Sequence, residues 1–253
     1  MVIIMIIHSF DDKTEPVIGL RDFYGERGSG FYTCIATFSN VIFDALMEMS
    51  DKVEVAHVST TNGGIPIYAL KNTVKPTAFY LSPIGSTLAA QICIEVNWLT
   101  GAKNFIMFGS CGSLDSEATR GKFIIPTEAY RDEGMSYHYA PPADYIKIKN
   151  ADRLAAIFGE LSLPYVKGRV WTTDAMLRET KGQLAKRKSE GCIAVEMELA
   201  GVQAVCDFYG FEVWDFLSAG DVLSENDYRV EGLSAANHDL DKLFAALEIA
   251  NRI

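Results

Sequence analysis

Short apolar runs alternate with amphipathic stretches along this chain of 253 residues. Apolar runs of roughly four to eight residues predict buried strands, and apolar residues spaced at i, i+3 and i+4 predict helices. The predicted strands span residues 2–7, 53–59, 65–70, 77–82, 104–109, 122–126, 165–171, 192–197 and 212–218. The predicted helices span residues 39–49, 86–100, 150–161, 179–190, 197–209 and 239–251.

Strands that alternate with helices indicate an α/β fold in which helices cover a largely parallel or mixed sheet. The turn sequence Asn62-Gly63-Gly64 lies between two predicted strands and adds an antiparallel hairpin. A chain of this length suits one large domain. We therefore expect residues 1–253 to form a single-domain three-layer αβα sandwich with a central mixed sheet.

Polar segments follow four of the predicted strands, at residues 109–113, 172–174, 196–198 and 220–221. In open α/β sheets, ligands bind beyond the carboxyl ends of the strands. We therefore expect these four segments to contribute to one site.

Charge and composition exclude several classes of function. A net charge of −10 argues against a non-specific nucleic-acid binder. No apolar run approaches the ~20 residues that a membrane helix requires. The five cysteines are scattered and odd in number, which is typical of free thiols in a reducing cytosol and predicts a cytoplasmic protein. The four histidines are dispersed without ligand spacing, so we predict no metal site.

The segment Gly109-Ser110-Cys111-Gly112-Ser113 allows two interpretations. It is either a strand-to-loop turn that needs glycine at positive φ, or a cradle in which backbone N–H groups and the Ser110 hydroxyl bind an anion or a sugar. It is not a G-x-S-x-G nucleophile elbow, because its central residue is Cys111. A nucleophilic Cys111 is the less favoured alternative.

Three carboxylates are candidates for chemistry. Glu196 and Glu198 flank Met197 just before a nearly uncharged helix, so they mark either a solvated helix start or a buried site that needs a partner. A ribose diol is such a partner, because each hydroxyl donates to a carboxylate oxygen. Asp221 is either a helix N-cap or an acid that donates a proton to a departing purine nitrogen, with Arg229 nearby in sequence.

Taken together, the chain from about residue 53 to its end resembles the nucleoside phosphorylase/nucleosidase superfamily. The order of the matching segments is more specific than any one of them. The segments are Pro83–Thr87, Gly109–Leu114, Gly121–Pro126, Arg131–Gly134 with Tyr137–Pro141, Thr172–Met176 and Val195–Glu198.

The resemblance implies roles for individual residues. Glu198 resembles the carboxylate that binds the ribose 2′ hydroxyl, Met197 the residue that packs on the sugar, and Glu196 its companion at the ribose. Ser110, with its neighbours Cys111 and Gly112, resembles the segment near the phosphate or the anomeric carbon. Asp221 resembles the acid that purine-cleaving members use at the base.

Two further features concern the base. Met176 occupies a place where relatives often carry an aromatic residue near the base. The segment Leu177–Lys181 lacks the Gln/Arg pair with which uridine-specific members recognise uracil, which favours a purine.

The phosphate-binding arginines of phosphorolytic relatives have no counterpart here. The region after the predicted first strand, residues 8–15, is acidic, and the other two positions hold Met107 and Val58. One explanation is that water replaces phosphate and is activated by Asp11, Asp12 or Glu15. The other is that different arginines have taken over, with Arg178 closest to a predicted site segment. The candidates are Arg21, Arg27, Arg120, Arg131 and Arg178.

The resemblance thus predicts a nucleoside phosphorylase that cleaves a ribonucleoside, with a purine favoured, and uses phosphate as co-substrate without any cofactor. A hydrolytic nucleosidase and a non-catalytic nucleoside-binding protein are the alternatives. Relatives are homo-oligomers with shared sites, so a dimer or hexamer is expected. His8 is then a substrate-binding candidate that reaches its own site or that of a neighbour.

Overall fold

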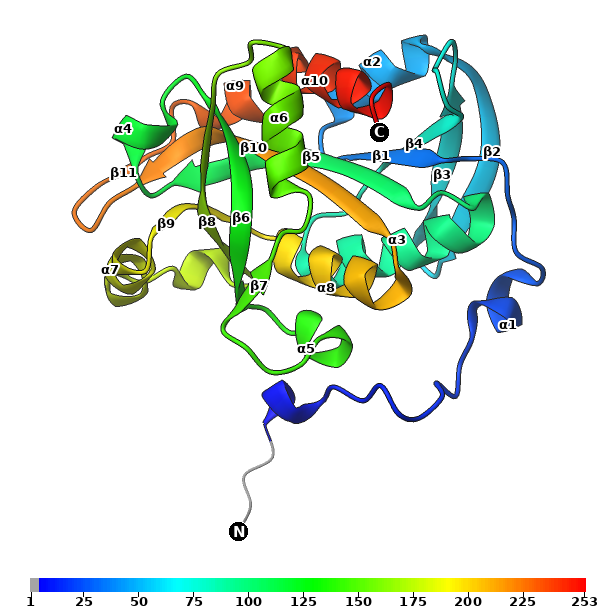
Figure 1. The fold of residues 1–253 in the computed structure, drawn as a ribbon, viewed down its shortest axis with the longest axis horizontal. Coiled ribbons are helices and arrows are strands. Elements are labelled where there is room, and N and C mark those ends of the chain that lie inside the picture. Colours follow the sequence, from blue (N-terminus) through cyan, green and yellow to red (C-terminus); the bar gives the residue numbers. More distant parts are fainter. Residues whose placement is uncertain (1–4) are drawn as a thin grey trace.

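The computed structural model describes residues 5–253, which fold into a single α/β domain around a mixed sheet (Figure 1). The strands of this eleven-stranded sheet are β1 (Thr33–Thr37), β2 (Ser50–Thr60), β3 (Gly63–Leu70), β4 (Thr77–Leu81), β5 (Asn104–Ser113), β6 (Phe123–Asp132), β7 (Tyr145–Lys147), β8 (Tyr165–Thr173), β9 (Cys192–Glu196), β10 (Glu212–Leu223) and β11 (Tyr228–Arg229). The helices are α1 (Leu20–Tyr24), α2 (Asn40–Glu48), α3 (Ser86–Thr100), α4 (Ser116–Thr119), α5 (Ser136–Tyr139), α6 (Ala151–Glu160), α7 (Lys181–Ser189), α8 (Leu199–Tyr209), α9 (Leu233–Asn237) and α10 (Leu240–Ala250).

Strand β5 is the centre of the sheet because it pairs with three other strands. It runs parallel to β10 along most of its length and to β1 over its first half, and its last residues pair antiparallel with β9. Strand β9 continues through β8 and β6 back to β10, so these five strands close a ring of pairings. Beyond β1, the strands β4, β3 and β2 extend the sheet on the other side. The carboxyl ends of β5, β9 and β10 are thereby brought together.

Helices cover both faces of the sheet, as the alternating pattern predicts (Figure 1). Ile42 and Leu46 of α2, Phe158 of α6 and Leu243 of α10 belong to one buried cluster. Apolar residues of α3 and α8, among them Val202, pack together in a second cluster with β1 and the first half of β5. The helices and the sheet therefore share two cores, one on each face.

The six predicted helices and eight of the nine predicted strands are confirmed, together with the hairpin between β2 and β3. The predicted strand over 2–7 is wrong where it can be compared. Residues 1–4 lie outside the described part of the chain, and Ile6–His8 form a short 3-10 helix without buried residues. Residues 5–32 contribute no strand and run along the outside of the domain near α5 and α3 (Figure 1).

The first strand of the sheet is instead β1, which the hydrophobic pattern did not predict. All five of its residues are buried, and it lies between β4 and β5. Threonines at both ends, Thr33 and Thr37, reduce its apolar run to three residues. Burial on both faces removes the alternation by which a half-exposed strand is recognised.

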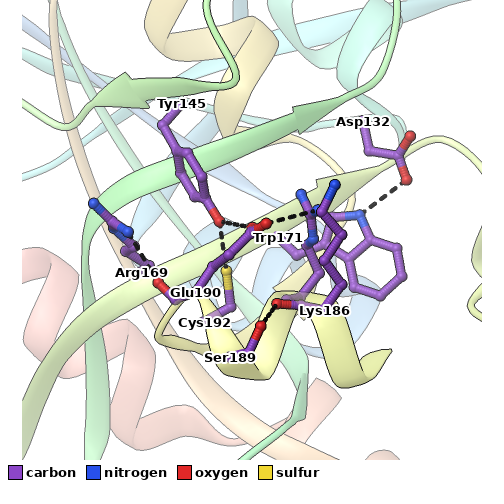
Figure 2. Close-up of polar contacts among 9 residues, drawn as sticks. Asp132, Tyr145, Arg169, Trp171, Lys186, Ser189, Glu190 and Cys192 are labelled. Carbon is purple, nitrogen blue, oxygen red and sulfur yellow. Dashed lines mark hydrogen bonds and ion pairs between the residues drawn. The ribbon is translucent and has the colours of Figure 1, made fainter. Parts of the chain in front are cut away.

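A cluster of polar side chains holds α7 against the sheet (Figure 2). The Tyr145 hydroxyl donates to Glu190 Oε2 over 2.6 Å and lies 3.5 Å from Cys192 Sγ. Arg169 Nη1 donates to the Glu190 carbonyl over 2.9 Å. At the edge of this cluster, Trp171 Nε1 donates to Asp132 Oδ2 over 3.0 Å. The contacts of Glu190 connect the C-terminal end of α7 to β7 and β8.

Composition also predicted unpaired cysteines. All five cysteines are buried and free of disulfides. Among the described residues, no helix has the length and apolarity needed to cross a membrane.

The loop after β6 is organised around Arg131, which is only 3% exposed. Its Nε donates to Ser136 Oγ over 2.7 Å, and its Nη1 donates to the Pro141 carbonyl over 2.7 Å. Its guanidinium carbon lies 4.2 Å from the centre of the Tyr137 ring. Arg131 is thus committed to the loop rather than to an anion.

We predict that Arg131→Met lowers the free energy of unfolding by about 2–4 kcal/mol, because buried carbonyl and hydroxyl groups lose their donors. Urea denaturation followed by circular dichroism measures this change. The control is Arg120→Met at an exposed position, for which a change within about 0.5 kcal/mol is expected. Equal losses in the two variants would contradict the structural role of Arg131.

Candidate active site

A cavity of about 730 Å³ opens where β5, β9 and β10 end. Further lining comes from the β1–α2 connection, from residues before α7 and from the α9–α10 segment. Eight residues that the sequence singled out line this cavity: Ser110, Cys111, Gly112, Met176, Glu196, Met197, Glu198 and Asp221.

The segment 109–113 is the end of strand β5, so the prediction of a strand-to-loop turn is wrong. The segment pairs with β10, and Gly112 and Ser113 also pair with β9. A Cβ on Gly112 would lie 2.4 Å from Leu223 Cδ1 and 2.9 Å from Val195 Cγ1. Glycine is therefore needed here for the close approach of neighbouring side chains and not for a positive φ.

Glu196 holds the beginning of α8. Its Oε2 accepts the backbone N–H groups of Glu198 over 2.7 Å and Leu199 over 2.8 Å, and its Oε1 accepts the Thr172 hydroxyl. Burial, followed by the charge of Glu198, raises the pKa of Glu196 to about 8. With three hydrogen bonds already accepted, Glu196 acts mainly by positioning Glu198.

Glu198 reaches from the start of α8 to the start of α3. Its Oε1 accepts the Gly85 N–H over 2.7 Å, and Gly85 adopts a φ of 105° that favours glycine. Burial raises the pKa of Glu198, while the amides of Gly85 and Met197 oppose that shift. The carboxylate lines the cavity with lone pairs left for a ligand.

A second group of polar side chains lies near Ser110, and sequence reasoning missed it. The Ser110 hydroxyl donates to Asn237 Oδ1, and Ser39 Oγ lies 2.8 Å from His238 Nδ1. Lys242 is 1% exposed and donates to the Ala236 carbonyl. Burial lowers the pKa of Lys242 to about 8.

These residues come from α9, α10 and the connection after β1, which is why the sequence did not reveal them. The available clue was β1 itself. Once residues 33–37 are recognised as the first strand, Phe38 and Ser39 become the residues that follow it.

Asp221 and Glu179 also line the cavity. Asp221 sits at an irregularity of β10, next to a register shift after Ala219. Burial raises the pKa of Asp221, and the Tyr228 hydroxyl partly opposes this. Burial, then the charges of Asp221 and Asp132, raises the pKa of Glu179 to about 7. Arg229, expected near Asp221, lies 3.7 Å from Asp227 instead, as measured from its Nε to Oδ2.

Two predicted site residues, His8 and Arg178, are exposed and do not line the cavity of this chain. None of the described residues that line it is an arginine; its cationic side chains are Lys181, Lys242 and, when protonated, His238. The prediction that Asp11, Asp12 or Glu15 follows the first strand is wrong, because these residues precede β1 in an exposed segment. Within one chain, none of the five candidate arginines replaces the missing ones.

The family model described as "Phosphorylase superfamily" matches residues 34–247. A purine nucleoside phosphorylase of the DeoD type from Caldanaerobacter subterraneus subsp. tengcongensis is 30% identical over 172 residues, which cover 63% of this chain and 71% of that protein. A DeoD-type purine nucleoside phosphorylase from Bacillus cereus is 30% identical over 137 residues, covering 52% of this chain and 58% of that protein.

Solved structures with the same fold include two proteins of low sequence identity. The 5′-methylthioadenosine/S-adenosyl homocysteine nucleosidase of Campylobacter jejuni has a TM-score of 0.70 and 18% identity, covering 88% of this chain and 100% of the other. The futalosine hydrolase of Helicobacter pylori has a TM-score of 0.67 and 16% identity, covering 89% and 97%. At these identities the likeness concerns the fold. The family match, which runs from β1 into α10 and includes the polar strand ends of the cavity, shows that this chain belongs to the Phosphorylase superfamily.

Proposed function

We propose that the protein is a nucleoside phosphorylase that cleaves the N-glycosidic bond of a purine ribonucleoside and transfers the ribose to phosphate. The products are the free base and ribose 1-phosphate. The observation that carries the proposal is the content of one cavity, in which Glu198, Asp221 and the Ser110–Lys242 group lie together. Sugar, base and acceptor thus each have a chemically suitable partner.

At the sugar, Glu198 accepts a hydroxyl of the ribose and Met197 packs against the ring. Cleavage of a glycosidic bond passes through an oxocarbenium-like transition state. A fixed carboxylate stabilises the positive charge that develops on the sugar. Because Glu196 holds the backbone at Glu198, the carboxylate is in place before the substrate binds.

At the base, Asp221 donates a proton as the C1′–N9 bond breaks. The electron pair of that bond passes into the purine, which leaves as a neutral base once a ring nitrogen is protonated. Burial raises the pKa of Asp221, which favours the protonated form that this step requires.

At the acceptor, Ser110, Ser39, Asn237 and His238 supply hydrogen-bonding groups, and Lys242 supplies positive charge. A lysine binds phosphate as a point charge and does not need the bidentate geometry of arginine. We propose that these residues replace the arginines that the sequence lacks. The DeoD-type relative from Caldanaerobacter is only 30% identical over the matched residues, so a different set of phosphate-binding residues is consistent with that comparison.

Hydrolysis is the second candidate function. One observation favours it: among the described residues that line the cavity, none is an arginine. Two structural neighbours carry the names of a nucleosidase and a hydrolase. Water would then take the place of phosphate beside Ser110.

We further propose that the protein assembles as a homo-oligomer. His8 and Arg178 are exposed and lie outside the cavity of their own chain. A second copy of the chain would bring them to a cavity. The resemblance implies such an arrangement, because neighbouring subunits of the relatives share their sites.

The acceptor is identified by measuring base release from inosine, adenosine, guanosine, uridine and methylthioadenosine, each with and without phosphate. We expect release from a purine nucleoside only when phosphate is present, with ribose 1-phosphate as product. Free ribose formed without phosphate would establish the nucleosidase instead. Binding without release from any nucleoside would establish the non-catalytic alternative.

We predict that Asp221→Asn lowers kcat for the purine nucleoside by roughly 10²–10⁴-fold, because an amide cannot deliver the proton. Glu198→Gln should lower kcat/KM by about 10–100-fold through losses in both binding and rate, because a charged hydrogen bond is lost. Steady-state kinetics measure both effects.

Glu225→Gln, at an exposed carboxylate of the same cavity, is the control and should change neither constant by more than about twofold. Wild-type rates in both site variants would show that the assigned site is wrong.

Phosphate affinity should depend on Lys242. Since burial lowers its pKa to about 8, the lysine is charged below that pH and loses its charge as the pH rises through it. The KM for phosphate should therefore increase above pH ~8. Lys242→Met should raise the KM for phosphate at pH 7 about tenfold or more while the KM for nucleoside stays within about twofold. Lys122→Met, outside the cavity, is the control, and circular dichroism checks folding. An unchanged KM for phosphate in folded Lys242→Met would contradict the assignment.

A further inference from the structure

Glu179 is a carboxyl group in the cavity that the proposed mechanism does not use. It follows the 3-10 helix Met176–Arg178 and immediately precedes α7, whose N-cap is Thr180. Its side chain lines the cavity, and no cation among the described residues lies within ion-pairing distance of its carboxyl group. An intramolecular ion pair therefore does not explain its placement.

Asp221 lines the same cavity. The two are near enough that the charge of Asp221 contributes to the raised pKa of Glu179. Tyr228 of β11 lines the same cavity, and burial, followed by the charge of Asp221 and later that of Glu179, raises its pKa. The other ionisable groups around Glu179 are Asp132 at the end of β6 and Lys181 at the start of α7.

Two neighbouring carboxyl groups without a compensating cation tend to share one proton, because both cannot ionise without repulsion. In that state one carboxyl group donates a hydrogen bond and the other accepts one. Along the edge that contains N7, a 6-aminopurine presents an acceptor at N7 and a donor at the amino group. A 6-oxopurine presents acceptors at both positions. The singly protonated pair matches only the 6-aminopurine.

We propose that Glu179 and Asp221 act as a carboxyl pair that selects 6-aminopurine nucleosides over 6-oxopurine nucleosides. The inference rests on the proposed function and names its substrate class. Glu179 is a specificity-determining residue that touches the base, while Asp221 keeps its role in protonation.

The proton balance of the step follows from this arrangement. The shared proton moves to N7 while the electron pair of the C1′–N9 bond enters the purine, so the base departs neutral. A phosphate oxygen forms the new bond to C1′. Both carboxylates are then ionised and accept the N7 and amino hydrogens, and the pair regains a proton from solvent after the base leaves.

The experiment compares kcat/KM for adenosine and inosine in the wild type, Glu179→Gln, Glu179→Asp and Glu225→Gln. A site built to pair with a substrate N–H group rejects the analogue that lacks it by a large factor, so we expect the wild type to prefer adenosine by about 100-fold or more. Glu179→Gln should reduce this ratio at least tenfold, because its amide N–H also suits an oxo group. Glu179→Asp keeps a carboxyl group and should keep most of the preference. Glu225→Gln should leave the ratio unchanged.

A pH profile supplies a second readout. The wild-type rate with adenosine should fall as pH rises through about 7, where the pair loses its shared proton. In Glu179→Gln the fall should move to lower pH, because Asp221 no longer has a partner carboxyl group with which to share a proton.

The outcomes separate this inference from the proposed function. Base release with no preference for adenosine, or an equal loss for both nucleosides in Glu179→Gln, would overturn the selection by Glu179 and leave the phosphorylase intact. Absence of base release from every nucleoside would overturn the proposed function itself. If Glu179→Gln does not fold, the adenosine preference and pH profile of Glu179→Asp decide the question.

Discussion

The candidate site depends on how the start of α8 is held. Helix N-termini leave backbone N–H groups without partners, and here the side chain of Glu196, at the end of β9, accepts two of them. That contact joins strand to helix at a fixed angle and presents Glu198 to the cavity. Glu198 in turn accepts the amide of Gly85 at the start of α3. Two buried helices and one strand thus meet at a pair of carboxyl groups.

The same constraint extends to the loop after β6. The Ser86 hydroxyl donates to Glu133 over 3.2 Å and lies 3.4 Å from the carbonyl oxygen of Glu198. Glu133 also accepts the backbone N–H of Ser136 over 2.9 Å, and Ser136 accepts Arg131. A continuous set of hydrogen bonds therefore runs from Arg131 to the backbone carbonyl of Glu198. Such a set keeps the site rigid because each buried polar group would be costly to leave without a partner.

Carboxyl groups dominate the electrostatics of the cavity and its floor. Burial raises the pKa of Glu179, Glu196, Glu198 and Asp221, and also that of Asp215, which is 6% exposed and has an oxygen without a partner. Glu196 and Glu179, whose pKa values rise to about 8 and about 7, therefore retain much of their proton near neutral pH, which lowers the negative charge that an incoming anion would meet. Lys242 and His238 lie together with Ser110, at the part of the cavity assigned to phosphate. Proton sharing thus makes an acid-rich cavity compatible with an anionic co-substrate.

The sequence by itself determined the α/β fold, the helices and most strands, because periodicity and apolar content record which faces are buried. It also singled out eight residues that line one cavity, since polar groups that follow apolar strands collect at the same edge of a sheet. Only the tertiary structure revealed that Ser39, Asn237, His238 and Lys242 meet Ser110, because these contacts join segments from opposite ends of the chain. It likewise decided that β1 precedes the site and that Glu179 and Asp221 line the same cavity. Distance along the chain carries no information about such pairs; packing of helices on both faces of a closed ring of strands brings them together.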